Sequence, residues 1–352
     1  MAPRHGPRRC GHFMRSLCAF LKRGAALGYS KLPGIFAAGL FLLILGLCAS
    51  SASAQENVTI GIAGENFSFL PFRIAQEKGF YKKYGLNVQH VRIPGANVAI
   101  SALVSGNLDY GTHYQVTMLW GVRGLGTRAI FSTASKQMFS FVVQPGIQSV
   151  KDLKGKLVGI PSIGSLGYKI TVKVLREVGM DPDKDVRFIA VGGDPNRAQQ
   201  LRAKQIDATM INPPLSIVMR KEGFRLLLQA SDYVDVPLTG LGTTLKKIKE
   251  NPEQVKKLLR ALYEGLQFVR ANRKETVEIF SRWLKIDPAI AEDTYELAVK
   301  TLSPDGLMSD ESVLAAIEIF SDNPKEMENV ALANAVDFSL LRAVIKEYPK
   351  KN

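Results

Sequence analysis

Residues 58–93 read VTIGIAGENFSFLPFRIAQEKGFYKKYGLNVQHVRI, and this stretch decides the fold class. It opens on a short β-rich run at 58–63 and continues with apolar residues at helical spacing between 70 and 83. A second β-rich run follows at 86–93. A helical pattern between two short β-rich runs predicts a strand, a helix and a parallel strand.

The same alternation continues along the chain in two series. The first adds a helix at 96–105 and strands at 108–111 and 129–133. The second predicts strands at 157–160, 186–190, 208–211 and 224–228, with helices at 167–178, 195–204 and 214–221 between them. Such alternation is typical of an α/β protein with helices on the faces of a parallel sheet. Two series in about three hundred residues predict two lobes.

From residue 251 onward the pattern becomes almost wholly helical. Asn251 and Asp287 are each followed by proline, a residue favoured at the first position of a helix. The helices that follow carry apolar residues on one face and charged residues on the other. We expect their apolar faces to pack into a core.

Two segments of the two series resemble each other. Residues 102–109 read ALVSGNLD and residues 200–207 read QLRAKQID, and each runs from a helix end into a strand through an aspartate. One interpretation is a duplicated lobe. The other is that turns between a helix and a strand often select an aspartate, without common descent.

The first 54 residues read as an export signal. They carry seven basic residues and no acidic one, then an apolar run at 34–49, then the small residues ASA before Gln55. This order predicts a signal peptide over residues 1–54, cleaved near Ala54, and a periplasmic location. The alternative is a retained membrane anchor, although the apolar run is shorter than the roughly 20 residues that span a bilayer.

The residues after the leader limit the chemistry. All three cysteines, Cys10, Cys18 and Cys48, lie in the leader, so disulfide, thiolate and sulfur-bound metal chemistry are not expected after cleavage. Only His90 and His113 remain as histidines, and we predict no metal site and no cofactor.

Removing the leader's seven basic residues lowers the formal charge from +14 to +7. The remaining basic residues are interleaved with acidic ones, which argues against nucleic-acid binding and favours small anions.

Three segments carry a resemblance to a known family. They are PFRIAQEKGFYKKYGL at 71–86, the segment 95–109 with its SGNLD, and SVKDLKGKLVGIP at 149–161. Together they resemble the solute-binding proteins of nitrate, sulfonate and taurine ABC importers, the NMT1/THI5-like or SsuA-like family. The similarity extends from about residue 58 to about residue 303.

This resemblance implies a type II periplasmic binding protein fold, in which two α/β lobes close on a small ligand. The first lobe would comprise residues 55–141, the second 142–237, and residues 238–352 would return to the first lobe and form the C-terminal helices. The implied partners are a small-molecule solute and the permease and ATPase subunits of an importer. The protein itself is expected to be a monomer.

Candidate ligand-binding residues follow from the ends of the predicted strands. In open α/β sheets, ligands bind at the carboxyl ends of strands, beside helix N-termini that offer free N–H groups. The loops there match positions that the family uses around its ligand. From the first lobe they supply Asn66, Phe67, Ser68, Phe69, Gly95, Asn97, Thr112, His113 and Tyr114, and from the second Ser162, Gly164, Ser165, Gly193, Asp194, Asn212 and Pro213.

The loop from Ser162 to Ser165 is the strongest of these, because a small, glycine-containing loop that opens a helix can present several donors to an anion. The alternative is an ordinary serine cap. Lys136 and Arg197 are the candidate cations, against a default of solvated surface residues.

Four apolar side chains and one histidine each have two interpretations. Phe67, Phe69, Tyr114 and Met138 would be either ligand-facing walls or core. His113 would be either a ligand contact or a buried histidine.

We therefore predict a protein that is not an enzyme and that captures a small anionic or zwitterionic organic solute by lobe closure. The alternatives are a membrane-anchored ligand sensor and a pyrimidine-precursor binding or biosynthetic protein on the same fold. The cysteine-rich iron motif of the eukaryotic pyrimidine-synthesis relatives is absent after the leader, and the string IGSLG at 163–167 lacks the first glycine of a nucleophile elbow. The sequence does not identify the solute.

Overall fold

The computed structural model of the chain describes residues 55–93, 95–321 and 330–349. Residues from Gln55 onward form one compact unit. The predicted signal peptide, its cleavage site and all three cysteines lie outside the described residues. None of the described helices is long and apolar enough to cross a membrane.

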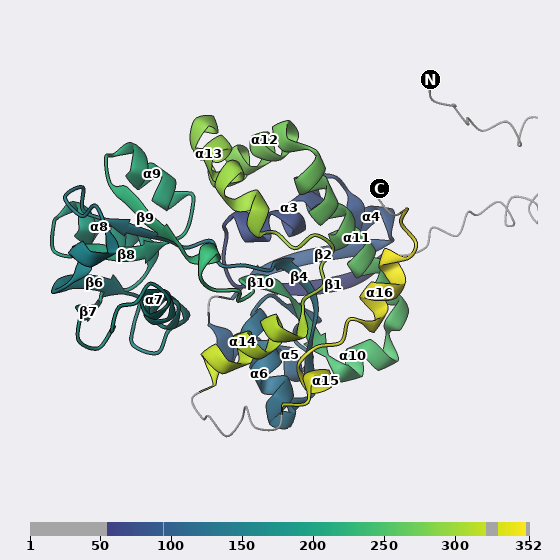
Figure 1. Cartoon of the computed structure of the whole chain (residues 1–352). Helices are drawn as coiled ribbons and strands as arrows, with labels where there is room; N and C mark the ends of the chain where they lie inside the picture. Colours follow the sequence, from purple (N-terminus) through teal and green to yellow (C-terminus); the bar gives the residue numbers. More distant parts are fainter. Residues whose placement is uncertain (1–54, 94, 322–329, 350–352) are drawn as a thin grey trace, which may run out of the picture. The chain divides into compact units, whose positions relative to one another are not determined.

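Two five-stranded sheets organise the described residues (Figure 1). The first has the order β2 (Leu86–Arg92), β1 (Glu56–Ile62), β3 (Tyr110–Gly111), β10 (Thr239–Thr244) and β4 (Thr127–Ala134). The second has the order β7 (Val186–Ala190), β6 (Lys156–Ile160), β8 (Ala208–Ile211), β5 (Ser140–Val143) and β9 (Arg225–Gln229). The predicted α/β class is confirmed.

Each sheet is mixed, which differs in part from the predicted parallel arrangement. Strands β1, β2 and β3 are parallel, as are β6, β7 and β8. Strand β10 runs antiparallel to both of its neighbours, and so does β5. The antiparallel strands are the ones that arrive from the other sheet, so local alternation of strand and helix could not reveal their direction.

The predicted helices beside the strands occur in the predicted order with one break, and one helix, α6 (Tyr114–Trp120), was not predicted. The predicted helix over residues 70–83 is two helices, α3 (Leu70–Glu77) and α4 (Phe80–Lys83). They part at Gly79, whose φ of 70° is the left-handed conformation that glycine tolerates. The other helices beside the strands are α5 (Ala96–Val104), α7 (Leu166–Glu177), α8 (Asp194–Arg202) and α9 (Leu215–Lys221).

The helical C-terminal region packs mainly on the first sheet. Its helices are α10 (Leu245–Glu250), α11 (Pro252–Ala271), α12 (Arg273–Leu284), α13 (Pro288–Ala298), α14 (Asp310–Phe320), α15 (Leu332–Ala335) and α16 (Ser339–Ile345). The long helix α11 lies directly on α3, where a Cβ on Gly265 would come within 2.4 Å of the Pro71 carbonyl oxygen. The predicted apolar stripe of α11, which includes Leu258, Leu262 and Leu266, is buried in this core.

Two crossing segments join the sheets. The chain leaves β4 through residues 135–139 to reach β5, and it returns from β9 through residues 230–238 to β10. The buried Gln137 side chain donates to the carbonyl oxygens of Val236 (3.0 Å) and Pro237 (2.9 Å). The two crossing segments are therefore tied to each other. Phe141 is the last residue of the predicted first lobe, and in the structure it pairs with strands of the second sheet.

The two similar aspartates make the same contacts. Asp109 Oδ2 accepts the Thr59 N–H and Asp207 Oδ2 accepts the Leu157 N–H, both at 2.8 Å. In each case the aspartate N–H returns a bond to the same residue's carbonyl oxygen, at 3.1 and 2.9 Å. Each aspartate directly precedes a strand, β3 or β8. It bonds the start of that strand to the first parallel strand of its series, β1 or β6. The two series repeat one arrangement of strands and one side-chain contact.

Candidate functional site

Polar side chains fix the loops at the carboxyl ends of the first sheet's parallel strands. Asn66 Oδ1 accepts from the Ser68 N–H (2.9 Å) and hydroxyl (2.7 Å) in the turn after β1. The Ser68 hydroxyl also lies 2.6 Å from that of Thr239, at the start of β10. After β3, the Thr112 hydroxyl accepts the Ala63 N–H at 2.9 Å. Ser68 and Thr112 are buried, so they position these loops.

Other predicted residues of this edge are open to solvent. Gly95 and Asn97 are exposed where α5 begins, and Asn66 is half-buried. Lys136 is half-buried in the first crossing segment. His113 is buried, with 7% of its surface accessible, at the start of α6. Of the predicted polar side chains at this edge, those of Asn66, Asn97 and Lys136 therefore keep accessible surface.

The large apolar residues considered as ligand-facing walls are core residues in this structure. Phe67 is fully buried and meets the rings of Phe280 and Tyr295 edge to face, at 5.3 and 5.9 Å between centroids. Phe69 and Met138 are buried in the same cluster. Tyr114 is fully buried and its hydroxyl contacts the Met308 sulfur at 2.9 Å. Packing against helices far along the chain holds these side chains inside.

In the second sheet, the loop after β6 forms a capped and exposed helix start. The Ser165 hydroxyl accepts the Tyr168 N–H (3.3 Å) and donates to the Ser162 carbonyl oxygen (2.7 Å). Gly164 has φ of +76°, which favours glycine. Ser162 and Gly164 are exposed and Ser165 is half-buried. Ser165 is thus a helix cap, and it leaves the partly positive start of α7 accessible to an anion.

Arg197 has a different environment from the one expected of a ligand-binding cation. Its side chain is 1% exposed and donates to the Thr209 hydroxyl (3.0 Å) and the Met210 carbonyl oxygen (3.0 Å). It also donates to the Gly192 carbonyl oxygen and to the Asp194 carboxylate. Burial lowers the pKa of Arg197, and Asp194 opposes that shift. The guanidinium is held by the protein and positions the loops around it.

Asp194 extends this network to the loop after β8. Its Oδ2 accepts the Asn212 N–H at 2.9 Å and the Asn212 side-chain amide at 3.3 Å. Gly193 is exposed and Asn212 is half-buried. Pro213 is buried and precedes a cis peptide bond to Pro214. Arg197 and Asp194 together fix the loops after β7 and β8 relative to each other.

Two exposed apolar residues at these edges were not among the predicted binding residues, although Ile163 lies in the predicted loop from Ser162 to Ser165. Val98 in the first turn of α5 is 64% exposed, and Ile163 in the loop after β6 is 68% exposed. An apolar residue within a loop of otherwise small and polar residues was the available signal for Ile163. Both lie beside predicted binding residues, so both add apolar surface to the candidate site.

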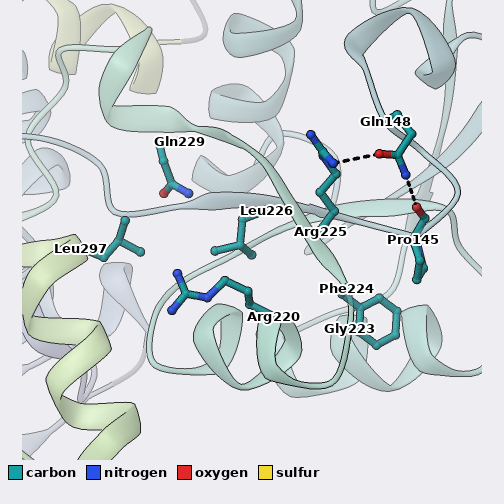
Figure 2. A pocket seen from close by; sticks show the side chains of 9 residues that line it. All are labelled: Pro145, Gln148, Arg220, Gly223, Phe224, Arg225, Leu226, Gln229 and Leu297. Carbon is teal, nitrogen blue, oxygen red and sulfur yellow. Dashed lines mark hydrogen bonds between the residues drawn. The ribbon is translucent and has the colours of Figure 1, made fainter.

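A cavity of about 400 Å³ at α5 is lined in part by the predicted residue Asn97, and one of about 150 Å³ is lined in part by Phe69. Two others lie away from the predicted binding residues. One of about 530 Å³ sits beside β9 and α9 and also contacts Leu297 of α13 (Figure 2). Its Arg225 donates to Gln148 at 2.9 Å, and its Arg220 pairs with Asp293 of α13 at 3.1 Å. Another, of about 1000 Å³, runs along α11. Neither contains a predicted binding residue, and no cluster of metal-ligating side chains occurs within residues 55–93, 95–321 and 330–349.

Comparison with known proteins identifies similar sequences and folds. The family model described as NMT1/THI5 like matches residues 66–276. A Brucella abortus (strain 2308) protein named as a binding protein is 31% identical over 241 residues, which cover 67% of this chain and 74% of that protein.

A more distant relative is a biosynthetic enzyme by name. The 4-amino-5-hydroxymethyl-2-methylpyrimidine phosphate synthase THI11 of Saccharomyces cerevisiae is 24% identical over 243 residues, 64% of this chain and 69% of that protein.

A solved structure shows the same fold. The periplasmic aliphatic sulphonate binding protein SsuA from Escherichia coli matches with a TM-score of 0.66 and 17% identity, over 80% of this chain and 92% of that one. The two sheets therefore form a periplasmic binding protein fold, whose parallel strands end at the loops described above.

The contacts of Arg197 predict a structural penalty when it is replaced. Arg197→Lys cannot reproduce the fork of donors, so the free energy of unfolding of the ligand-free protein should fall by about 3 kcal/mol, as when a buried ion pair is broken. The matched control is Arg202→Lys, whose exposed pair with Glu222 should cost less than about 1 kcal/mol. Urea unfolding measures both. Equal, small effects would contradict the positioning role.

Proposed function

Because this chain belongs to the NMT1/THI5-like family, we propose that it is the solute-binding protein of an ABC importer. One observation carries the proposal. In both sheets, predicted polar residues that keep accessible surface lie at the carboxyl ends of parallel strands, on loops that buried side chains hold in place. A protein of this fold uses such loops to hold a small molecule.

The accessible groups favour an anionic or zwitterionic solute. The open start of α7, with Ser162, Gly164 and Ser165, offers backbone donors and a partial positive charge. Lys136 supplies a full positive charge. The exposed Val98 and Ile163 favour a solute with an organic part over a bare inorganic ion. The sulphonate named for the Escherichia coli neighbour has both properties.

We infer that binding closes the two lobes. The lobes are joined by the crossing segments 135–139 and 230–238. Because Gln137 bonds the first segment to the second, we expect the two segments to bend together. A solute that touches loops of both lobes favours the closed state by the contacts it makes only there. The leader is proposed to direct export, with the folded protein beginning near Gln55 in the periplasm and delivering its solute to a permease.

Two alternatives remain distinguishable. A membrane-anchored sensor would retain the leader, so the N-terminal residue of the protein isolated from its host tests that reading. A pyrimidine-biosynthetic role follows from the synthase relative. The chain carries no cysteine after Cys48, so the cysteine-rich motif of those enzymes has no counterpart in the folded part.

The first test is a thermal-shift screen of residues 55–352 with aliphatic sulfonates, taurine, nitrate, aromatic carboxylates and pyrimidines. A solute at 100 times its Kd adds about 2.7 kcal/mol of stability, which raises the Tm by several degrees. We expect a shift with an organic anion or zwitterion. A shift with pyrimidines alone would favour the biosynthetic alternative, and no shift in a ligand-free sample would contradict the proposed solute classes.

A charge placed at the start of α7 tests the anion site. Ser165→Asp keeps a good helix cap, so stability should stay within about 0.5 kcal/mol, while the carboxylate repels an anionic solute and raises its Kd at least tenfold. The control Thr244→Asp changes another capping residue, at the opposite edge of the first sheet, and should leave the Kd unchanged. Titration calorimetry with the solute from the screen gives both values. Unchanged affinity in Ser165→Asp would show that the anionic group of the solute does not bind at the start of α7.

Closure predicts a smaller particle with solute bound. Small-angle X-ray scattering should show a lower radius of gyration at saturation than in the free protein, because the lobes approach each other. The control is the same measurement with a related compound that gave no thermal shift. Identical scattering with a saturating, confirmed solute would argue against capture by lobe closure.

A further inference from the structure

A second cavity of about 1000 Å³ lies along the outer face of α11. One face of α11 lines the cavity. It carries Tyr263, Gln267 and Ala271, which are spaced four residues apart. Ile345 and Tyr348, from the end of the chain, form another wall. All of these residues lie outside the strand ends that form the candidate solute site.

The walls of this cavity are aromatic and only half-buried. Phe268 of α11 meets Phe80 of α4 at 6.3 Å between ring centroids. Tyr263 of α11 meets Tyr348 at 4.8 Å. All four rings retain accessible surface. Such a concave, mostly apolar surface of this volume has the properties of a small-molecule site, and its aromatic faces suit a planar ligand.

The carboxylate in the wall is already fully engaged. Glu264 accepts from Lys83 Nζ at 2.6 Å, from the Tyr348 hydroxyl at 3.0 Å and from the Tyr84 hydroxyl. Burial would raise the pKa of Glu264, yet these hydrogen bonds hold it below its usual value. The Glu264 carboxylate is thus already paired within the protein. It therefore does not favour a cationic ligand in the cavity.

The cations at the cavity are not neutralised in the same way. Arg270 and Lys346 are exposed, and neither forms an ion pair with any residue in the described part of the chain. Arg270 makes one bond, to the Leu302 carbonyl oxygen at 3.2 Å. Burial and the Asp305 carboxylate raise the pKa of Tyr263, and Asp305 accepts the Leu307 N–H at 2.9 Å. The two cations leave the cavity with a net positive charge.

We propose that this cavity is a second ligand site, which binds an aromatic carboxylate with its rings against Phe268 and Tyr263 and its carboxylate toward Arg270 and Lys346. The aromatic walls select the ring system, and the two unpaired cations select the anion. This site is independent of the proposed solute site, because the two share no residue.

The probe is 1-pyrenebutyrate, a fluorescent aromatic carboxylate, with the neutral 1-pyrenebutanol as its matched analogue. Both are titrated into residues 55–352. Arg270→Gln combined with Lys346→Gln should weaken pyrenebutyrate about tenfold and leave pyrenebutanol unchanged. The control, Lys246→Gln combined with Lys249→Gln, removes the same charge from exposed positions of α10 and should change neither. Equal affinity of the two double variants for pyrenebutyrate would overturn the proposal.

A filling substitution tests the cavity itself. Ala271→Phe, at the exposed end of α11, should weaken both probes because the ring occupies their space. If this variant does not fold, the charge variants still decide the matter. Ser165→Asp should leave pyrenebutyrate binding intact, and the solute from the thermal screen should not displace it. Displacement, or loss of binding in Ser165→Asp, would assign the probe to the solute site and overturn this proposal while supporting the first.

Discussion

The returning strand β10 is the constraint on which the first sheet depends. It enters between β3 and β4, and helix α6 packs directly against it. A Cβ on Gly240 would come within 2.3 Å of the Phe131 carbonyl oxygen and 2.6 Å of the Tyr114 ring, and one on Gly242 within 2.5 Å of Thr117. The alternating glycines therefore make room for the helix. Through Thr239, the same strand contacts Ser68 at the candidate site.

The two sheets fix their site loops by different chemistry. In the first sheet, the neutral groups of Asn66, Ser68 and Thr112 bond to each other and to the backbone. In the second, the ion pair of the buried Arg197 with Asp194 connects strand β8 with the loops after β7 and β8. Both arrangements leave backbone and small polar groups exposed at the strand ends. A site built this way is positioned before ligand arrives, which reduces the ordering cost of binding.

The segment at 71–86, which carries part of the family resemblance, also contributes to the cavity along α11. In the stretch at 71–86, Gly79 and Gly85 have positive φ values of 70° and 74°, so they shape the turns between α3, α4 and β2. That geometry places Phe80 in the cavity along α11, on a different surface from the strand ends. A segment that carries the family resemblance thus also forms part of the wall of this cavity.

The elements of the two α/β series were predictable because strand and helix patterns are local. The strand at 186–190 and the one at 208–211 agree residue for residue with β7 and β8. The prediction of a single helix over 70–83 was wrong only at the turn around Gly79, whose left-handed conformation ends the first helix. Loops at strand ends were also predictable, since chain order alone puts them at one edge.

The sequence by itself determined the α/β class, the charge pattern and most elements of the two series, because these depend on neighbouring residues, whereas the local patterns did not predict α6, β5 and β10. At the candidate site, tertiary structure alone decided which side chains face solvent. Phe67 is buried by Phe280, more than two hundred residues away, and Arg197 is enclosed by groups on β8 and on the loops beside it. Side-chain direction at a site depends on contacts between elements distant in the chain, and periodicity carries no information about them.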